Sequence, residues 1–316
     1  MTSDNNSNHH HPPFVPLIEI PEFEASAPPE QIAHTIIHAL QTSGFLLVTT
    51  PHLTRDLQTQ ALQAATQFLE RSNEESSLVV SHPTDPKDYA MLQQPDCSGD
   101  TILKEYFASL RATKASLLQL VAVGLDLDVD YFTRLHDEDN DTLRLIRYHP
   151  VTRHVGNRCK EHSDYGTLTL LSTDGVSGLE AFFEGQWLPV PYEKGALVVN
   201  IGTLLSEWTQ GKLLATLHRV AGPASHNSHT PSEQLLAASS RSRTSMAFFC
   251  DPNQGVVRSI QEHRNTNTTS SSSSQPQSVM EYIQWRSGGS SMDRSGVQFT
   301  EQEEQRVQSD DKSGGK

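Results

Sequence analysis

Apolar residues near the start of the chain recur at the three- and four-residue spacing of amphipathic helices. Residues 28–44 read PPEQIAHTIIHALQTSG, with apolar side chains at positions 32, 36, 37 and 40 and with Gly44 just past the end, where glycine commonly terminates a helix. The same spacing recurs in TRDLQTQALQAATQFLERS, residues 54–72, which starts at Thr54, a residue type that caps helices. These two segments are predicted to be helices.

A third and longer helical pattern covers residues 102–127, ILKEYFASLRATKASLLQLVAVGLDL. A short β-branched run, FLLVTT, follows the first helical segment. Residues 73–100 show neither period and are predicted to be a loop.

After Asp139 the pattern changes to short runs separated by Gly, Pro, Asp or Ser, which predicts an antiparallel sandwich or barrel. The seven runs are LRLIRY, TLTLLST, GLEAFF, QWLPVP, ALVVNIG, LHRVAG and RTSMAFFC. One helix is expected among them, TLLSEWTQGK, with Thr203 as its N-cap and Gly211 as its terminator. The sequence therefore predicts an α+β protein, with N-terminal helices packed on a β core.

Net charge, cysteine content and hydrophobicity indicate which partners and which cellular compartment to expect. The net charge is −14, so the chain lacks the Lys and Arg surplus that binds phosphate backbones, and no nucleic-acid partner is expected. Three cysteines, Cys97, Cys159 and Cys250, form no close pair, which favours a reducing compartment. The most apolar stretch, LLQLVAVGLDL, falls short of the roughly 20 residues that span a bilayer, and no leader peptide is recognisable. We expect a soluble, cytoplasmic protein with no membrane partner; its oligomeric state is unknown.

A candidate metal site begins at EHSDYGTLTLLST, residues 161–173. His162 and Asp164 stand two positions apart, and such residues share a face of an extended strand. His218 in TLHRVAG is the candidate third ligand, from a later strand. Two histidines and one carboxylate that leave open positions are the ligand set of non-haem Fe(II) oxygenases, although affinity alone would also allow zinc.

A candidate anion clamp lies in RTSMAFFCDPN. Arg243 and Ser245 share one strand face, while Met246, Phe248 and Cys250 share the other. A guanidinium binds a carboxylate through two charge-assisted hydrogen bonds, and a neighbouring hydroxyl adds a third. The pair could hold the far end of a dicarboxylic acid; the alternative is a surface arginine in a sandwich strand.

The order of these motifs resembles the isopenicillin N synthase-like group of Fe(II)- and 2-oxoglutarate-dependent oxygenases. The resemblance rests on HSD, then NIGTLLSEWTQGKLLATLHRVAGP, then RTSMAFFCDPN, together with the upstream segments LIEIPEF and ALQTSGFLLVTTPHL. It covers about residues 14 to 253. It implies a double-stranded β-helix (jelly-roll) core under the N-terminal helices.

The resemblance also implies roles for single residues. His162, Asp164 and His218 become the iron ligands, and Arg243 with Ser245 binds the distal carboxylate of the cosubstrate 2-oxoglutarate. Tyr148 resembles a tyrosine beside the cosubstrate, although His149 separates it from the proline that usually follows directly, so either residue could lie there. Asn200 matches an asparagine beside the metal pocket; a structural amide is the alternative. No side chain is needed as a catalytic acid or base.

On this basis the chain divides into five parts. They are a disordered N-terminus at 1–13, the N-terminal helical region of the family at 14–138, the jelly-roll oxygenase domain at 139–255, a low-complexity linker at 256–278, and a short helix with a disordered acidic tail at 279–316.

The sequence departs from the family at three further places, one of which is the segment between the second and third helices, shorter here than in most members. Thr203 replaces a usual aspartate, and the interval from His218 to Arg243 is longer than is typical. The surplus, SHNSHTPSEQLLAASS, is expected to form a polar hairpin extension with His226 and His229 solvated.

The expected function is an oxygenase that uses Fe(II), 2-oxoglutarate and O2 to oxidise, by default to hydroxylate, a small-molecule substrate with release of succinate and CO2. Desaturation or ring closure are the alternative outcomes. The rival functions are a family oxidase that does not use 2-oxoglutarate and a non-catalytic jelly-roll binding module. A zinc hydrolase with Glu161 as general base is set aside, because Glu161 should face away from its neighbour His162.

Overall fold

The computed structural model describes residues 14–24, 27–75, 79–81, 87–93, 100–151 and 156–253. Three expectations lie outside the described residues: the disordered start at 1–13, the linker at 256–278, and the helix and tail at 279–316.

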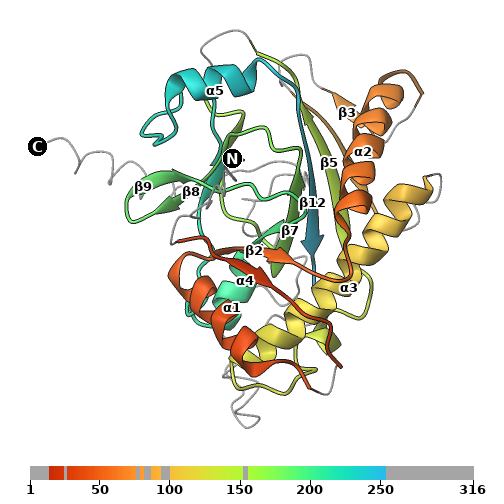
Figure 1. Cartoon of the computed structure of the whole chain (residues 1–316), viewed down its shortest axis with the longest axis vertical. Coiled ribbons are helices and arrows are strands. Elements are labelled where there is room, and N and C mark those ends of the chain that lie inside the picture. Colours follow the sequence, from red (N-terminus) through yellow and green to blue (C-terminus); the bar gives the residue numbers. More distant parts are fainter. Residues whose placement is uncertain are drawn as a thin grey trace, which may run out of the picture.

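A large sheet runs through the middle of the molecule (Figure 1). Apart from the parallel pair β1 and β2, neighbouring strands in it are antiparallel. In spatial order its strands are β1 (Leu17–Glu19), β2 (Phe45–Thr49), β10 (Leu197–Ile201), β7 (Leu168–Thr173), β12 (Arg243–Cys250), β5 (Thr142–Tyr148), β4 (Lys87–Leu92) and β3 (Val79–Ser81).

A smaller antiparallel sheet faces the large one. Its strands are β6 (Cys159–His162), β11 (His218–Val220), β8 (Leu179–Phe183) and β9 (Gln186–Pro189). Apolar side chains join the two sheets: Val220 and Cys159 of the small sheet pack with Ile146 and Tyr148 of the large one. This pair of facing sheets is the jelly-roll arrangement expected from the sequence.

The three N-terminal helices are confirmed. They are α1 (Glu30–Thr42), α2 (Arg55–Glu75) and α3 (Thr101–Gly124). The residue after the α1 cap, Gly44, has a φ of 71°, a conformation that glycine adopts without strain. The Thr54 hydroxyl accepts a hydrogen bond of 3.1 Å from the Leu57 amide, so Thr54 caps α2 as predicted.

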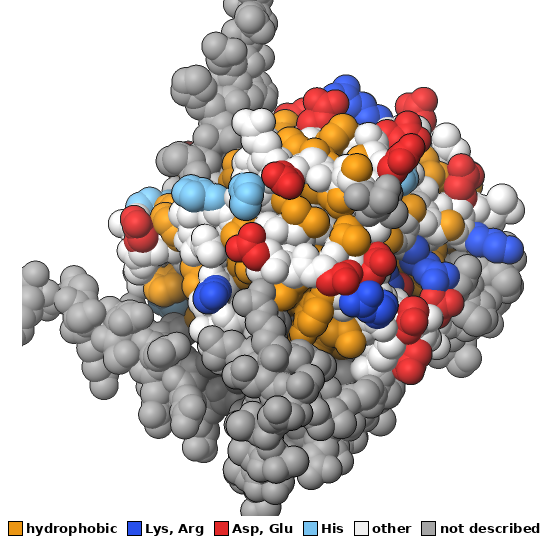
Figure 2. Space-filling view, turned by 90° about the horizontal axis from the view of Figure 1, so that it is seen from below, with side chains coloured by type: hydrophobic (Ala, Val, Ile, Leu, Met, Phe, Trp, Pro, Cys, Tyr) orange, Lys and Arg blue, Asp and Glu red, His pale blue; other side chains and the backbone are white. Residues whose placement is uncertain are grey.

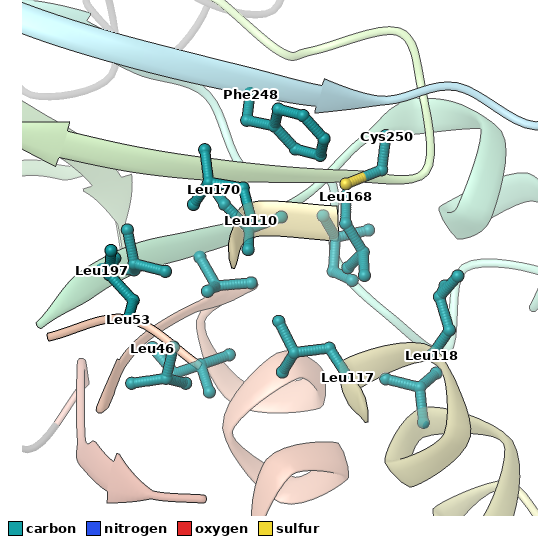
Figure 3. Close-up of a cluster of buried hydrophobic side chains, with 14 of the residues drawn as sticks. Leu46, Leu53, Leu110, Leu117, Leu118, Leu168, Leu170, Leu197, Phe248 and Cys250 are labelled. Carbon is teal, nitrogen blue, oxygen red and sulfur yellow. The ribbon is translucent and has the colours of Figure 1, made fainter. Parts of the chain in front are cut away.

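Helices α2 and α3 cover the outer face of the large sheet (Figure 1). Leucines of α3 meet Leu168, Leu170 and Phe248 of the sheet in the main core (Figure 3). The rings of Phe107 and Phe248 meet edge to face with centroids 5.1 Å apart, a geometry worth roughly 0.5–1.5 kcal/mol beyond the buried area. The helices thereby stabilise the sheet from outside and leave its inner face for other side chains.

The loop predicted over residues 73–100 is wrong in part. Helix α2 continues to Glu75, and the hairpin strands β3 and β4 extend the large sheet beyond β5. In β4 the side chains alternate between half-buried and buried, a period of two that is too short to stand out in the sequence. Its backbone pairs with β5, more than 50 residues later, so the strand depends on non-local contacts.

Three expectations for the C-terminal half also need correction. Thr203 is the first residue of α4 (Thr203–Trp208), whereas extended Gly202 is its N-cap; the Thr203 amide instead donates to the Asp164 carbonyl at 2.8 Å. The expected polar hairpin contains a second interrupting helix, α5 (Ser232–Ser239), which Leu235 anchors in the core. Strand β6 was not among the seven predicted runs.

The surface is mixed in character. In the view from below, acidic side chains are spread among hydrophobic ones (Figure 2). In the described part of the chain, every helix is too short or too polar to cross a bilayer.

Candidate metal centre and the adjoining cavity

The three candidate ligands converge between the two sheets. His162 ends β6 and is paired directly with His218, the first residue of β11. The Asp164 Oδ1 atom lies 3.7 Å from Nε2 of each histidine, and the two imidazole centroids are 4.1 Å apart. Asp164 itself lies in the loop beyond β6, so this convergence comes from the turn after the strand rather than from strand alternation.

Each histidine is oriented by its other ring nitrogen. Nδ1 of His162 lies 2.9 Å from the Lys160 carbonyl, and Nδ1 of His218 lies 3.2 Å from the Thr216 carbonyl. A carbonyl only accepts, so each Nδ1 carries a hydrogen, and Nε2 is the nitrogen of each ring that faces the centre and can bind a metal ion. This is how metal-binding histidines are usually held.

The carboxylate of Asp164 is held from one side only. Its Oδ2 atom accepts hydrogen bonds from the Thr169 hydroxyl at 2.6 Å and from the Asn200 side-chain amide at 2.7 Å. Oδ1 is left facing the two Nε2 atoms. Two imidazole nitrogens and one carboxylate oxygen within 4.8 Å of one another are a donor set that fits Fe(II) or another divalent metal ion.

Protonation states suit metal binding. Burial lowers the pKa of His162, neighbouring His218 lowers it further, and the opposing effect of Asp164 is smaller. Burial would raise the pKa of Asp164, but the two histidines and the hydrogen bonds from Thr169 and Asn200 outweigh burial and hold it below its usual value. At neutral pH the His162 imidazole is therefore uncharged and the Asp164 carboxylate is ionised, which are the forms that bind metal ions.

Thr169 is a residue that the sequence analysis missed. It sits opposite Asn200 in the register of β7 and β10, so the two side chains approach Asp164 from neighbouring strands. No local signal marks it within the run TLTLLST; only the pairing of β7 with β10 reveals its position.

The candidate clamp is buried in the same interior. Arg243 is 1% exposed, which rules out the surface-arginine alternative. Its Nη1 donates to the Ser245 hydroxyl at 3.2 Å and its Nε donates to the Val176 carbonyl at 3.2 Å. Its Cζ lies 5.3 Å from the ring centroid of Tyr148, the residue paired with it on β5.

Tyr148, rather than His149, lies beside the clamp. His149 instead lies within 2.8 Å of the Asp88 carboxylate and is half exposed. Burial raises the pKa of Tyr148 well above its usual value, so its hydroxyl stays protonated. Glu161 lies beside Arg219 and Asn157, away from the candidate ligands, as expected.

A cavity of about 370 Å³ adjoins this interior, and Arg243 forms part of its wall. Leu47, Leu171 and Val198, aligned across β2, β7 and β10, form another part. Phe45, Thr169 and Asn200 lie two residues further along the same three strands. Phe45 contacts the His218 ring, and Thr169 and Asn200 donate hydrogen bonds to Asp164. Because a strand rises about 3.3 Å per residue, the cavity wall lies about 7 Å along the strands from the candidate centre.

Part of the cavity wall comes from the long segment between His218 and Arg243. His229, Thr230 and Pro231 line the cavity together with Gln234 of α5. His226 and His229 are exposed, as expected.

Comparison with known proteins agrees with this geometry. Residues 139–252 match the model of the 2OG-Fe(II) oxygenase superfamily. The 2-oxoglutarate-Fe(II) type oxidoreductase ppzD of Metarhizium rileyi is 32% identical over 164 residues, which are 49% of this chain and 44% of that protein. The proline hydroxylase buaE of Petromyces alliaceus is 30% identical over 167 residues, half of each chain. The chain thus spans about half the length of these curated relatives.

Solved structures share the fold over most of the chain. A full-length Neurospora crassa protein in complex with alpha-KG matches with a TM-score of 0.69 at 22% identity, over 86% of this chain and 95% of that one. JOX2 in complex with 2OG, Fe and JA matches with a TM-score of 0.65 at 22% identity, over 93% and 90%. At these identities the likeness concerns the fold, and it confirms the predicted α+β jelly-roll class.

Proposed function

We propose that the chain is a member of the 2OG-Fe(II) oxygenase superfamily, whose model matches residues 139–252, and that it is an Fe(II)- and 2-oxoglutarate-dependent oxygenase. It oxidises, by default hydroxylates, a small molecule and releases succinate and CO2. The observation that carries this proposal is the convergence of His162, Asp164 and His218 beside an interior that also holds the buried Arg243 and Ser245 pair.

The metal ligands in this proposal are Nε2 of His162, Nε2 of His218 and Oδ1 of Asp164. Bound there, Fe(II) supplies with O2 the oxidising power that turns a C–H bond into C–OH while 2-oxoglutarate loses CO2 and becomes succinate. Asn200 and Thr169 hold Oδ2 of Asp164, so that Oδ1 stays aimed at the centre. The chain needs no side chain that exchanges protons with substrate.

The cosubstrate is positioned by the clamp. The Arg243 guanidinium and the Ser245 hydroxyl bind the distal carboxylate of 2-oxoglutarate, and the Tyr148 ring flanks the guanidinium. Leu47, Leu171 and Val198 provide an apolar wall that excludes water from the cavity. The small-molecule substrate enters the same interior from the cavity side.

Two further expectations form part of the proposal. The N-terminal region at residues 14–138, which supplies three helices and also strands β1 to β4 of the large sheet, precedes the jelly-roll domain at residues 139–255. A cytoplasmic location is supported by Cys159 and Cys250, which are both free thiols in the structure.

The test measures iron binding and cosubstrate turnover together. Protein purified without oxygen is loaded with Fe(II), and succinate formed from 2-oxoglutarate on admission of O2 is measured by mass spectrometry. His218→Ala should lose both iron and succinate formation, whereas His226→Ala, a change at an exposed histidine, should keep both. Iron retained in His218→Ala would contradict the ligand assignment. Iron bound without succinate formation over a broad substrate panel would favour the oxidase that does not use 2-oxoglutarate.

A further inference from the structure

A second arginine, Arg158, is buried beside the clamp. It directly precedes β6, is 3% exposed, and its backbone amide donates to the Val220 carbonyl at 2.7 Å. Its Cζ lies 5.2 Å from the centroid of the Tyr148 ring, the same ring that Arg243 approaches to 5.3 Å. Both guanidinium groups therefore lie against one tyrosine.

Most of the hydrogen-bonding capacity of Arg158 is unused. Its Nη2 donates to the His149 carbonyl at 2.9 Å, but its buried Nε and Nη1 have no hydrogen-bond partner among the described residues. Leaving a buried donor unsatisfied costs about 1–3 kcal/mol, and more for a charged group. Such a side chain is expected where a ligand supplies the missing acceptor.

The charge of Arg158 is also uncompensated within the described part of the chain. No ion pair joins Arg158 or Arg243 to a carboxylate there, and burial together with the charge of Arg243 lowers the pKa of Arg158 to about 10. Asp174, the acidic group that acts on Arg158 in the opposite direction, is engaged by backbone amides. It accepts from the amide of Val176 at 3.0 Å and from the amide of Thr244 at 2.7 Å.

A buried cation without a carboxylate is unfavourable unless an anion lies beside it. Arg243 already donates to Ser245 and to a backbone carbonyl, so Arg158 has the larger unused capacity. We infer that Arg158 is a second carboxylate-binding group of the interior, adjacent to the Arg243 and Ser245 clamp. The inference rests on the proposed function, because its ligand is a carboxylate of the cosubstrate or of a carboxylate-bearing substrate.

The first experiment detects the anion without metal or turnover. Metal-free protein is heated in the presence of glutarate, and separately in the presence of its uncharged analogue glutaramide. Glutarate should raise the melting temperature of the wild type more than glutaramide does, because ligands that bind the native state stabilise it. Arg158→Gln should lose most of this difference, and Arg158→Lys should keep part of it because the charge remains.

The matched control is Arg241→Gln, which removes an exposed arginine near the start of β12. It should respond to glutarate as the wild type does. The inference is overturned if glutarate has no advantage over glutaramide in the wild type, or if Arg158→Gln and Arg241→Gln respond alike.

The second experiment identifies the source of the carboxylate. Calorimetric titration of 2-oxoglutarate into Fe(II)-loaded protein without O2 should show an increase in Kd of at least about tenfold for Arg158→Gln if the cosubstrate is the ligand. If the substrate is the ligand, that Kd stays within about twofold of the wild-type value. Succinate formation should then be stimulated more by carboxylic acids than by their amides, and this preference should disappear in Arg158→Gln.

The outcomes separate this inference from the proposed function. If the wild type forms no succinate and does not bind 2-oxoglutarate but still shows the Arg158-dependent glutarate effect, the oxygenase proposal fails and the anion site stands. If the wild type binds 2-oxoglutarate with Fe(II) and Arg158→Gln is unchanged in all three assays, the oxygenase stands and the anion site fails.

Discussion

Replacing Arg219 by methionine should destabilise the protein by about 3–5 kcal/mol, although the residue touches no candidate ligand directly. Arg219 is 2% exposed and points away from the centre, one residue after His218. Its guanidinium bonds the Glu180 carboxylate at 2.9 Å and Glu161 at 3.2 Å. It also lies 4.1 Å from the centroid of the Trp187 ring.

The magnitude follows from what the substitution leaves behind. Methionine fills a similar volume, so little cavity forms, but the fully buried Glu180 loses its cation. Removing one partner of a buried ion pair costs about 3–5 kcal/mol, because the remaining charge is desolvated without compensation. The hydroxyls of Ser228 and Thr230 still donate hydrogen bonds to Glu180. The loss in free energy of unfolding should therefore not exceed this range.

The assay is a double-mutant cycle in urea. Glu180→Gln removes the stranded charge and keeps an acceptor for the two hydroxyls, so the double variant Arg219→Met and Glu180→Gln should regain about 2 kcal/mol relative to Arg219→Met alone. A loss below about 1 kcal/mol in Arg219→Met, or no recovery in the double variant, would refute the reasoning.

Three further predictions concern the centre, the clamp and the core. Asn200→Ala removes one of two donors to Asp164 and should weaken Fe(II) binding by roughly 10- to 100-fold in anaerobic titrations. Arg243→Lys should raise the KM for 2-oxoglutarate by at least about tenfold while the folded state persists, because an ammonium lacks the paired donors of a guanidinium. Burial lowers the pKa of His136 from 6.5 to about 4, so its contribution of about 3 kcal/mol is present above pH 6.5 and is lost as the pH falls toward 4. His136→Gln should flatten that part of the stability curve measured by urea unfolding.

Each of these predictions has an outcome that contradicts it. Unchanged iron affinity in Asn200→Ala would leave Asn200 as a structural amide only. A KM for 2-oxoglutarate in Arg243→Lys that matches the wild type would place the cosubstrate elsewhere. An identical pH profile in His136→Gln would show that other groups govern stability between pH 6.5 and 4.

The helices were predictable because their signals are local. The apolar spacing in α1 and the cap at Thr54 of α2 can be read within a few residues of chain. Strand β4 and helix α5 were missed because their stability comes from distant partners: β4 pairs with β5, and α5 buries Leu235. Non-local pairing of this kind leaves little trace in a short window of sequence.

The candidate metal ligands could be predicted from the sequence, but the buried polar residues around them could not. The spacing of His162, Asp164 and His218, with the resemblance, pointed to one centre, and the structure brings the three side chains together. Thr169 and Arg158 carry no such signal, because each is polar in a segment where polar residues are ordinary. Their roles depend on strand register and burial, which appear only in three dimensions.

Three buried arginines near the candidate site are opposite in sign to the net charge of the chain. The sequence carries a net charge of −14, yet Arg144, Arg158 and Arg243 are all at least nine-tenths buried. Arg144 stacks over Tyr89, with Cζ 4.7 Å from the ring centroid, while the other two share Tyr148. Salt at about 0.15 M screens charges beyond roughly 8 Å, so the negative charge of the chain repels a distant anion only weakly. Beside the buried arginines screening is weak, and a bound anion is attracted there. Selectivity for anions in such a protein arises after entry, so added salt should change the dissociation rate of a bound dicarboxylate far less than its association rate.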